Sequence, residues 1–292
     1  MEKWMTEKKT YDLAFGLGYS CGASQALRDA GLQFASFPLD WVGSPGIVQS
    51  AEMVVNGFAH WIDRDALELV DVRRGSGFNT RIYRNRITGF GFSHEFGDFQ
   101  SFDESYPKVV AMYGRRIERL GDLLRKSKSI LLVYLELPFR ACASREDILR
   151  ARRLLAEKYP DAAFDLLYVF EDPADISPRV VLEEDGVTVL ALDYRMFDRG
   201  EITHFVRTDA LAAYLRQNVT VRDYRTEADR ARRQVAFEGD IMCRWGRKGT
   251  VRSLANRWAF RIFRHLEKYL ISRGLVQREG PLWFVNREGG DR

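Results

Sequence analysis

Runs of apolar residues alternate along the chain with segments whose apolar residues recur at helical spacing. Four apolar runs are typical of strands buried on both faces of a parallel sheet: Tyr11–Phe15, Ser129–Leu135, Asp165–Phe170 and Val187–Leu192. Four amphipathic or capped segments predict helices between them: Ala23–Ala30, Ile47–Ile62, Tyr106–Lys126 and Ser144–Lys158. The pattern predicts an α/β fold with a mostly parallel sheet flanked by helices.

Shorter segments modify this picture. A short strand is expected at Phe34–Phe37, and a β-hairpin insertion is expected from three segments, Leu67–Val72, Arg81–Arg84 and Ile87–Phe92. A last amphipathic helix, Val251–Arg273, predicts a C-terminal helical extension. We therefore expect an α/β domain over residues 1–235 and a basic helical extension over 236–292 that packs on it.

Charge is concentrated in that extension. The net charge is only +4, yet Arg244 to Arg278 contains ten basic residues and one acid, Glu267. Such a block favours a polyanion or an anionic membrane surface as partner, although a solvated helix face paired with acids elsewhere gives the same pattern. We expect the apolar stripe of the helix to pack on the core and its arginines to face outward or toward the active-site mouth.

The cysteine content argues against a disulfide framework and for a reducing compartment. The chain of 292 residues has three cysteines, Cys21, Cys142 and Cys243, which are far apart and odd in number. The four histidines are scattered and no Cys-x-x-Cys pair occurs, so we expect no metal and no cofactor. No signal peptide or membrane span is recognisable, and a cytoplasmic location is expected.

The glycine-rich turn before Cys21 is the main chemical signal. A strand pattern ends in Gly16-Leu-Gly18-Tyr-Ser20-Cys21-Gly22, and a helix pattern begins there. A helix N-terminus offers unpaired N–H groups and partial positive charge, which lower the pKa of a thiol. Gly18, Ser20 and Gly22 would then contact a ligand beside the sulfur. A small buried cysteine in a structural turn remains the alternative, and the phosphate-binding glycine pattern does not fit the spacing.

Two further groups of residues could complete a site. His94 leaves the predicted hairpin with Glu95 and Asp98 close by, so it is the best candidate for a base that serves Cys21. Arg116 and Arg119 lie three residues apart on one helix and could together hold a carboxylate or phosphate, or simply be solvated.

The dipeptide Asp40-Trp41 follows Pro38 and has two interpretations. It could orient a base or bind a polar ligand. It could equally form a turn in which Asp40 caps local backbone and Trp41 anchors the core.

These motifs, in order and spacing, resemble the bacterial DUF1796 family, whose members are described as papain-like cysteine peptidases. The resemblance covers roughly residues 11 to 135 and rests on the Cys21 turn, Phe37-Pro-Leu-Asp40-Trp41, His94-Glu-Phe96 and Arg116-Ile-Glu-Arg119-Leu. It implies Cys21 as nucleophile, His94 as base and Asp40 or Asp98 as the orienting acid. It also implies an association with cell-surface polysaccharide functions, so the unknown substrate could be anionic or glycan-linked.

Three functions follow as hypotheses. The first is a thiol-dependent hydrolase or acyltransferase in which backbone N–H groups near Gly22 stabilise the oxyanion. The second is a non-catalytic anion-binding protein that uses the glycine turn, Arg116 and Arg119. The third is a transferase that acts on glycans or sugar phosphates.

Overall fold

A computed structural model describes most of the first 225 residues. The described residues are 8–19, 21–75, 78–97, 101–136, 141–172, 178–193, 195–198, 201–206 and 208–225. Ser20, Asp98 and the predicted C-terminal extension lie outside them, so the expectations for these residues stay predictions. Met1–Tyr224 forms one compact unit by its internal contacts.

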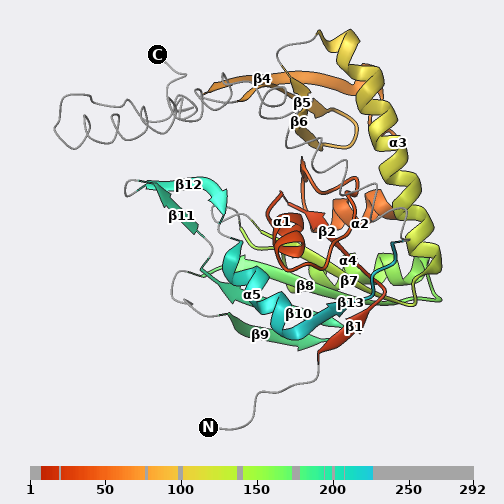
Figure 1. Ribbon diagram of the computed structural model, residues 1–292, viewed down its shortest axis with the longest axis vertical. Helices are drawn as coiled ribbons and strands as arrows, with labels where there is room; N and C mark the ends of the chain where they lie inside the picture. The colour runs from red at the N-terminus through yellow and green to blue at the C-terminus, as the bar shows by residue number, and fades with distance from the viewer. Residues whose placement is uncertain are drawn as a thin grey trace, which may run out of the picture. The chain divides into compact units, whose positions relative to one another are not determined.

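The centre of this unit is a five-stranded sheet (Figure 1). Its strand order is β2 (Leu13–Gly18), β7 (Ser129–Leu135), β8 (Ala163–Glu171), β10 (Val187–Leu192) and β9 (Arg179–Glu184). The first four strands in this order run parallel to one another. They correspond to the four strands expected from the apolar runs.

β9 corrects the expectation of a mostly parallel sheet, because it pairs antiparallel with β10 and makes the sheet mixed. The two strands are joined by Asp185 and Gly186, which both have positive φ, 46° and 71°. This conformation is typical of a two-residue hairpin turn, which returns the chain antiparallel beside the strand it has just left.

Helices cover both faces of the sheet. Successive residues of a buried strand point to opposite faces, so Ile130, Leu132 and Tyr134 enter one hydrophobic core and Leu131, Val133 and Leu135 the other. The first core is closed by α2 (Ile47–Val55), α3 (Phe102–Lys126) and α4 (Arg145–Lys158). The second is closed by α1 (Cys21–Asp29) and α5 (Asp209–Asn218). This layering explains why β7, which is buried on both faces, is apolar from Ile130 to Leu135.

The expected hairpin insertion is larger than predicted. It is a four-stranded antiparallel sheet in the order β3 (Val42–Gly43), β6 (Gly91–Gly97), β5 (Phe78–Asn85) and β4 (Leu67–Gly75), and a 3₁₀ turn, Arg64–Ala66, precedes β4. The helix α3 contacts β6, and Figure 1 shows α3 running from this sheet toward the central one. No strand forms at Phe34–Phe37; that segment is a loop.

Two small sheets complete the described residues. β1 (Lys9–Tyr11) pairs parallel with β13 (Val219–Val221), and β11 (Arg195–Asp198) pairs antiparallel with β12 (Glu201–Val206). Of the helices in the described ranges, none combines the length and the apolar character that a membrane span requires.

Candidate active site

Cys21 is the first residue of α1, and β2 ends shortly before it, at Gly18. The two glycines of β2 make this geometry possible. A Cβ atom at Gly16 would lie 2.7 Å from Ser24 Oγ, so only glycine lets α1 approach the strand this closely. Gly18 has a φ of +99°, which side chains rarely tolerate. Gly16 and Gly18 therefore help to place the cysteine at the helix N-terminus, and only Gly18 of these two was also predicted to contact a ligand.

The environment of Cys21 opposes its ionisation. The residue is partly buried, and burial raises the pKa of its thiol, while a backbone hydrogen bond acts weakly in the opposite direction. The sequence predicted the reverse, because a helix N-terminus lowers a thiol pKa when the sulfur is well solvated. This environment favours the neutral thiol of Cys21 over the thiolate.

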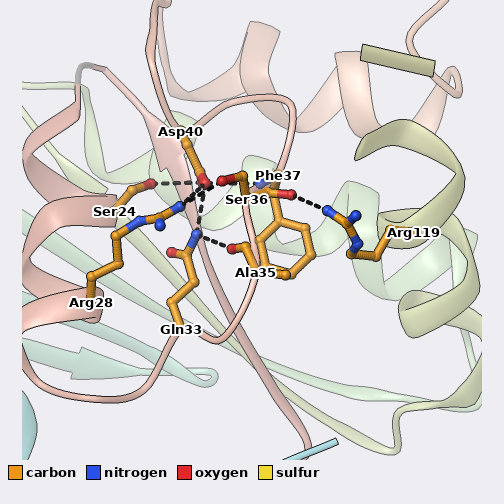
Figure 2. Close-up of polar contacts among 8 residues, drawn as sticks. All are labelled: Ser24, Arg28, Gln33, Ala35, Ser36, Phe37, Asp40 and Arg119. Carbon is orange, nitrogen blue, oxygen red and sulfur yellow. Dashed lines mark hydrogen bonds and ion pairs between the residues drawn. The ribbon is translucent and has the colours of Figure 1, made fainter. Parts of the chain in front are cut away.

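Asp40 joins α1 to the loop that follows the helix (Figure 2). Its side chain is fully buried and accepts four hydrogen bonds, each 2.8 Å long. The donors are the Ser24 hydroxyl, the Arg28 guanidinium, the Gln33 amide and the Phe37 backbone N–H. Burial raises the pKa of Asp40, and the Arg28 charge and the other donors oppose that shift. Asp40 thus caps local backbone, as one of the two sequence interpretations held.

Three residues of α1 share one face of the helix. Cys21, Ser24 and Arg28 are spaced by three and four positions, so their side chains follow one another along the helix. The last two bind Asp40, which places the Cys21 side chain about one turn beyond this buried network. The sequence analysis missed Ser24, Arg28 and Gln33. Ser24 and Arg28 could have been found, because they follow Cys21 at helical spacing.

Trp41 connects this network to His94. The Arg28 guanidinium lies over the Trp41 ring at 5.3 Å, and the rings of Trp41 and His94 meet edge to face at 6.0 Å. His94 is exposed on β6, whereas Trp41 is partly buried. Trp41, which was predicted to contact a ligand, therefore lies against His94, the predicted base.

A second set of hydrogen bonds, centred on Glu95, involves the strand that carries His94. The Tyr113 hydroxyl of α3 donates to one oxygen of Glu95 at 2.9 Å, and the His94 backbone N–H donates to the other at 3.0 Å. Burial first, and then the Glu95 charge, raise the pKa of Tyr113 well above its usual value, so its hydroxyl remains a donor. Arg116 lies over the Tyr113 ring at 5.4 Å.

The comparisons place the chain in a family. A family model described as "Putative papain-like cysteine peptidase (DUF1796)" matches residues 12–168, more than half of the 292 residues. The chain belongs to the DUF1796 family. This confirms the resemblance seen in the sequence, and the matched segment includes Cys21, Asp40, His94 and both α3 arginines. The comparisons with curated proteins and with solved structures found no match.

Proposed function

We propose that this DUF1796 protein is a thiol-dependent hydrolase or acyltransferase with Cys21 as nucleophile and His94 as base. One observation carries the proposal. Cys21 opens a helix whose next residues on the same face, Ser24 and Arg28, bind Asp40, and the residue after Asp40 packs against His94. The family's description as a cysteine peptidase supports the same chemistry.

The raised pKa of Cys21 determines how the proton must move. Because the sulfur stands as a thiol, a base has to remove its proton during attack. The sulfur then bonds to the acyl carbon, the thiol proton passes to the His94 imidazole, and the bond to the leaving group breaks as that group takes the proton. Water or another acceptor next attacks the thioester and regenerates the thiol. Backbone N–H groups of the first turn of α1, near Gly22, stabilise the oxyanion.

Asp40 acts in this proposal as a positioning residue. Both of its oxygens are occupied by donors from α1 and the loop, so its role is to hold Trp41 and α1 together. Asp98 remains the proposed partner that orients His94.

Acylation by p-nitrophenyl acetate tests the proposal. We expect a burst of nitrophenolate and an acetyl group on the Cys21 peptide in mass spectrometry. Cys21→Ala should abolish both, and His94→Ala should slow acylation by about a hundredfold or more. Cys142 is exposed and serves as a reference thiol on the same chain. Equal acetylation of Cys142, with the burst retained in Cys21→Ala, would refute the proposal.

The pH dependence supplies a second readout of the same prediction. Since burial raises the Cys21 pKa, less thiolate is present at neutral pH than for an ordinary cysteine. Iodoacetamide labelling of Cys21 should therefore rise with a midpoint more alkaline than that of a solvated thiol. A labelling midpoint below pH 7 would contradict this prediction. It would mean that Cys21 is already a thiolate paired with a protonated His94, so that no general base is needed during attack.

A non-catalytic anion-binding protein is the second candidate. The observation in its favour is that, within the described residues, neither Arg116 nor Arg119 forms an ion pair. Anion binding that persists while Cys21 proves unreactive would favour this alternative.

A further inference from the structure

The two arginines predicted to act as a pair have separate roles. Arg119 Nη1 donates to the Ser36 carbonyl at 2.9 Å and so ties α3 to the loop that precedes Asp40 (Figure 2). Arg116 lies over the Tyr113 ring, and its Nη1 atom is shielded from solvent without an acceptor in the described part of the chain. Arg116 is thus a partly buried cation with one nitrogen, Nη1, that has no hydrogen-bond acceptor among the described residues.

The neighbouring acids do not supply the missing acceptor for Arg116 Nη1. Glu95 is the acid bonded to Tyr113, and its two oxygens accept hydrogen bonds from the Tyr113 hydroxyl and the His94 backbone. Asp40 also acts on Tyr113 electrostatically, but Arg28 balances its charge. A buried N–H group without an acceptor costs free energy, which an incoming oxygen would recover.

We propose that Arg116 binds a carboxylate of the substrate, so that the acyl donor is an acidic compound. The inference rests on the proposed function for its link to Cys21. Tyr113, the ring beneath Arg116, binds the residue after His94, so the guanidinium lies beside the strand of the proposed base. A carboxylate is favoured over a phosphate because only one guanidinium is available: Arg119 is anchored on Ser36 and Arg28 is paired with Asp40.

Calorimetry with Cys21→Ala protein tests binding without thiol chemistry. The probes are N-acetyl-glutamate, N-acetyl-glutamine and inorganic phosphate. We expect N-acetyl-glutamate to bind about tenfold or more tightly than the other two. Arg116→Gln should remove this preference, and Arg116→Lys should keep part of it. Arg115→Gln is the matched control, because it removes the same charge from an adjacent exposed residue.

Three results would overturn the inference: no binding of N-acetyl-glutamate, equal binding of N-acetyl-glutamine, or an equal effect of Arg115→Gln. Equal or tighter binding of phosphate would overturn the assignment of a carboxylate. If Arg116→Gln does not fold, as judged by circular dichroism, the ligand preferences of the parent and of Arg116→Lys decide the question.

Alkylation separates this inference from the proposed function. N-iodoacetyl-glutamate and N-iodoacetyl-glutamine carry the same reactive group, so the ratio of their rates at Cys21 reports the preference for charge. We expect the ratio of the glutamate rate to the glutamine rate to be well above one at Cys21 and higher than at Cys142. In Arg116→Gln, the ratio at Cys21 should fall to the value measured at Cys142. Selective binding with an inert Cys21 would refute the proposed function alone. A Cys21 that p-nitrophenyl acetate acylates but that shows no preference for charge would refute the carboxylate site alone.

Discussion

Asp40 is the residue whose loss should cost this fold most in the region of the site. Asp40→Asn would place an amide N–H against donors and leave the Arg28 guanidinium without its counter-charge. We expect the free energy of unfolding, measured in urea, to fall by about 3 kcal/mol. This is the lower end of the range for a broken buried ion pair, because the Arg28 side chain is 21% exposed.

Asp122→Asn provides the control for that measurement. Asp122 also pairs with an arginine, Arg125, but both side chains are at least half exposed. Solvent screens such a pair, so its loss should leave the urea midpoint unchanged within error. Equal effects of the two substitutions would contradict a structural role for Asp40.

The sequence identified most of the individual residues of this region but not their environments. Cys21, Asp40, Trp41 and His94 stood out by motif. The side-chain partners of Asp40 did not, because they come from a helix and a loop whose approach is a tertiary contact. The burial that raises the Cys21 pKa was equally invisible, since helix position alone predicts a lowered one.

Among the secondary-structure elements, α3 depends on its first turn. Ser101 accepts from the Glu104 N–H, and the Glu104 carboxylate accepts from the Ser101 N–H, which forms a capping box. Ser101→Ala should lower the stability by about 1 kcal/mol at neutral pH. Glu118→Ala, at an exposed position within the same helix, should have little effect.

Acid should narrow that difference in stability. Hydrogen bonds to the Ser101 backbone and hydroxyl lower the pKa of Glu104. A lowered folded-state pKa gives stability that is present above the unfolded-state pKa and is lost as the pH falls through the folded one. The difference in unfolding free energy between the parent protein and Ser101→Ala, measured by urea titration, should therefore become smaller as the pH is lowered. A difference that stays constant with pH would show that the Glu104 carboxylate does not contribute to the stability of the cap.

How well an element could be predicted depended on whether its signal was local. The apolar runs gave β7 and β10 with their bounds, and Ser144 is the N-cap predicted for α4. α2 ends at Val55 rather than at residue 62, because Gly57, Phe58 and His60 adopt positive φ. β9 was missed, although Asp185-Gly186 is a hairpin signal.

For the molecule as a whole, the basic C-terminal segment carries the remaining prediction. Charge reversal at Arg257, Arg261 and Arg264 should weaken binding to anionic liposomes or to a polyanion, because like charges then repel. Thermal stability should be almost unchanged if these arginines are solvated. Unchanged binding would reduce them to ordinary surface residues, and a collapse in stability would indicate buried ion pairs.

The pairing of β1 with β13 has a mechanical consequence. Near the start of the chain and near residue 221, two short strands lie parallel, with Lys9 opposite Val219 and Tyr11 opposite Val221. The Arg222 N–H also donates to the Tyr11 carbonyl at 2.9 Å, and the Arg222 side chain pairs with Asp12. Tension applied to the two ends of such a parallel pair acts in shear, so it loads these bonds together rather than one after another. A force applied between the residue before β1 and the residue after β13 would therefore have to break these bonds together before the two strands could separate.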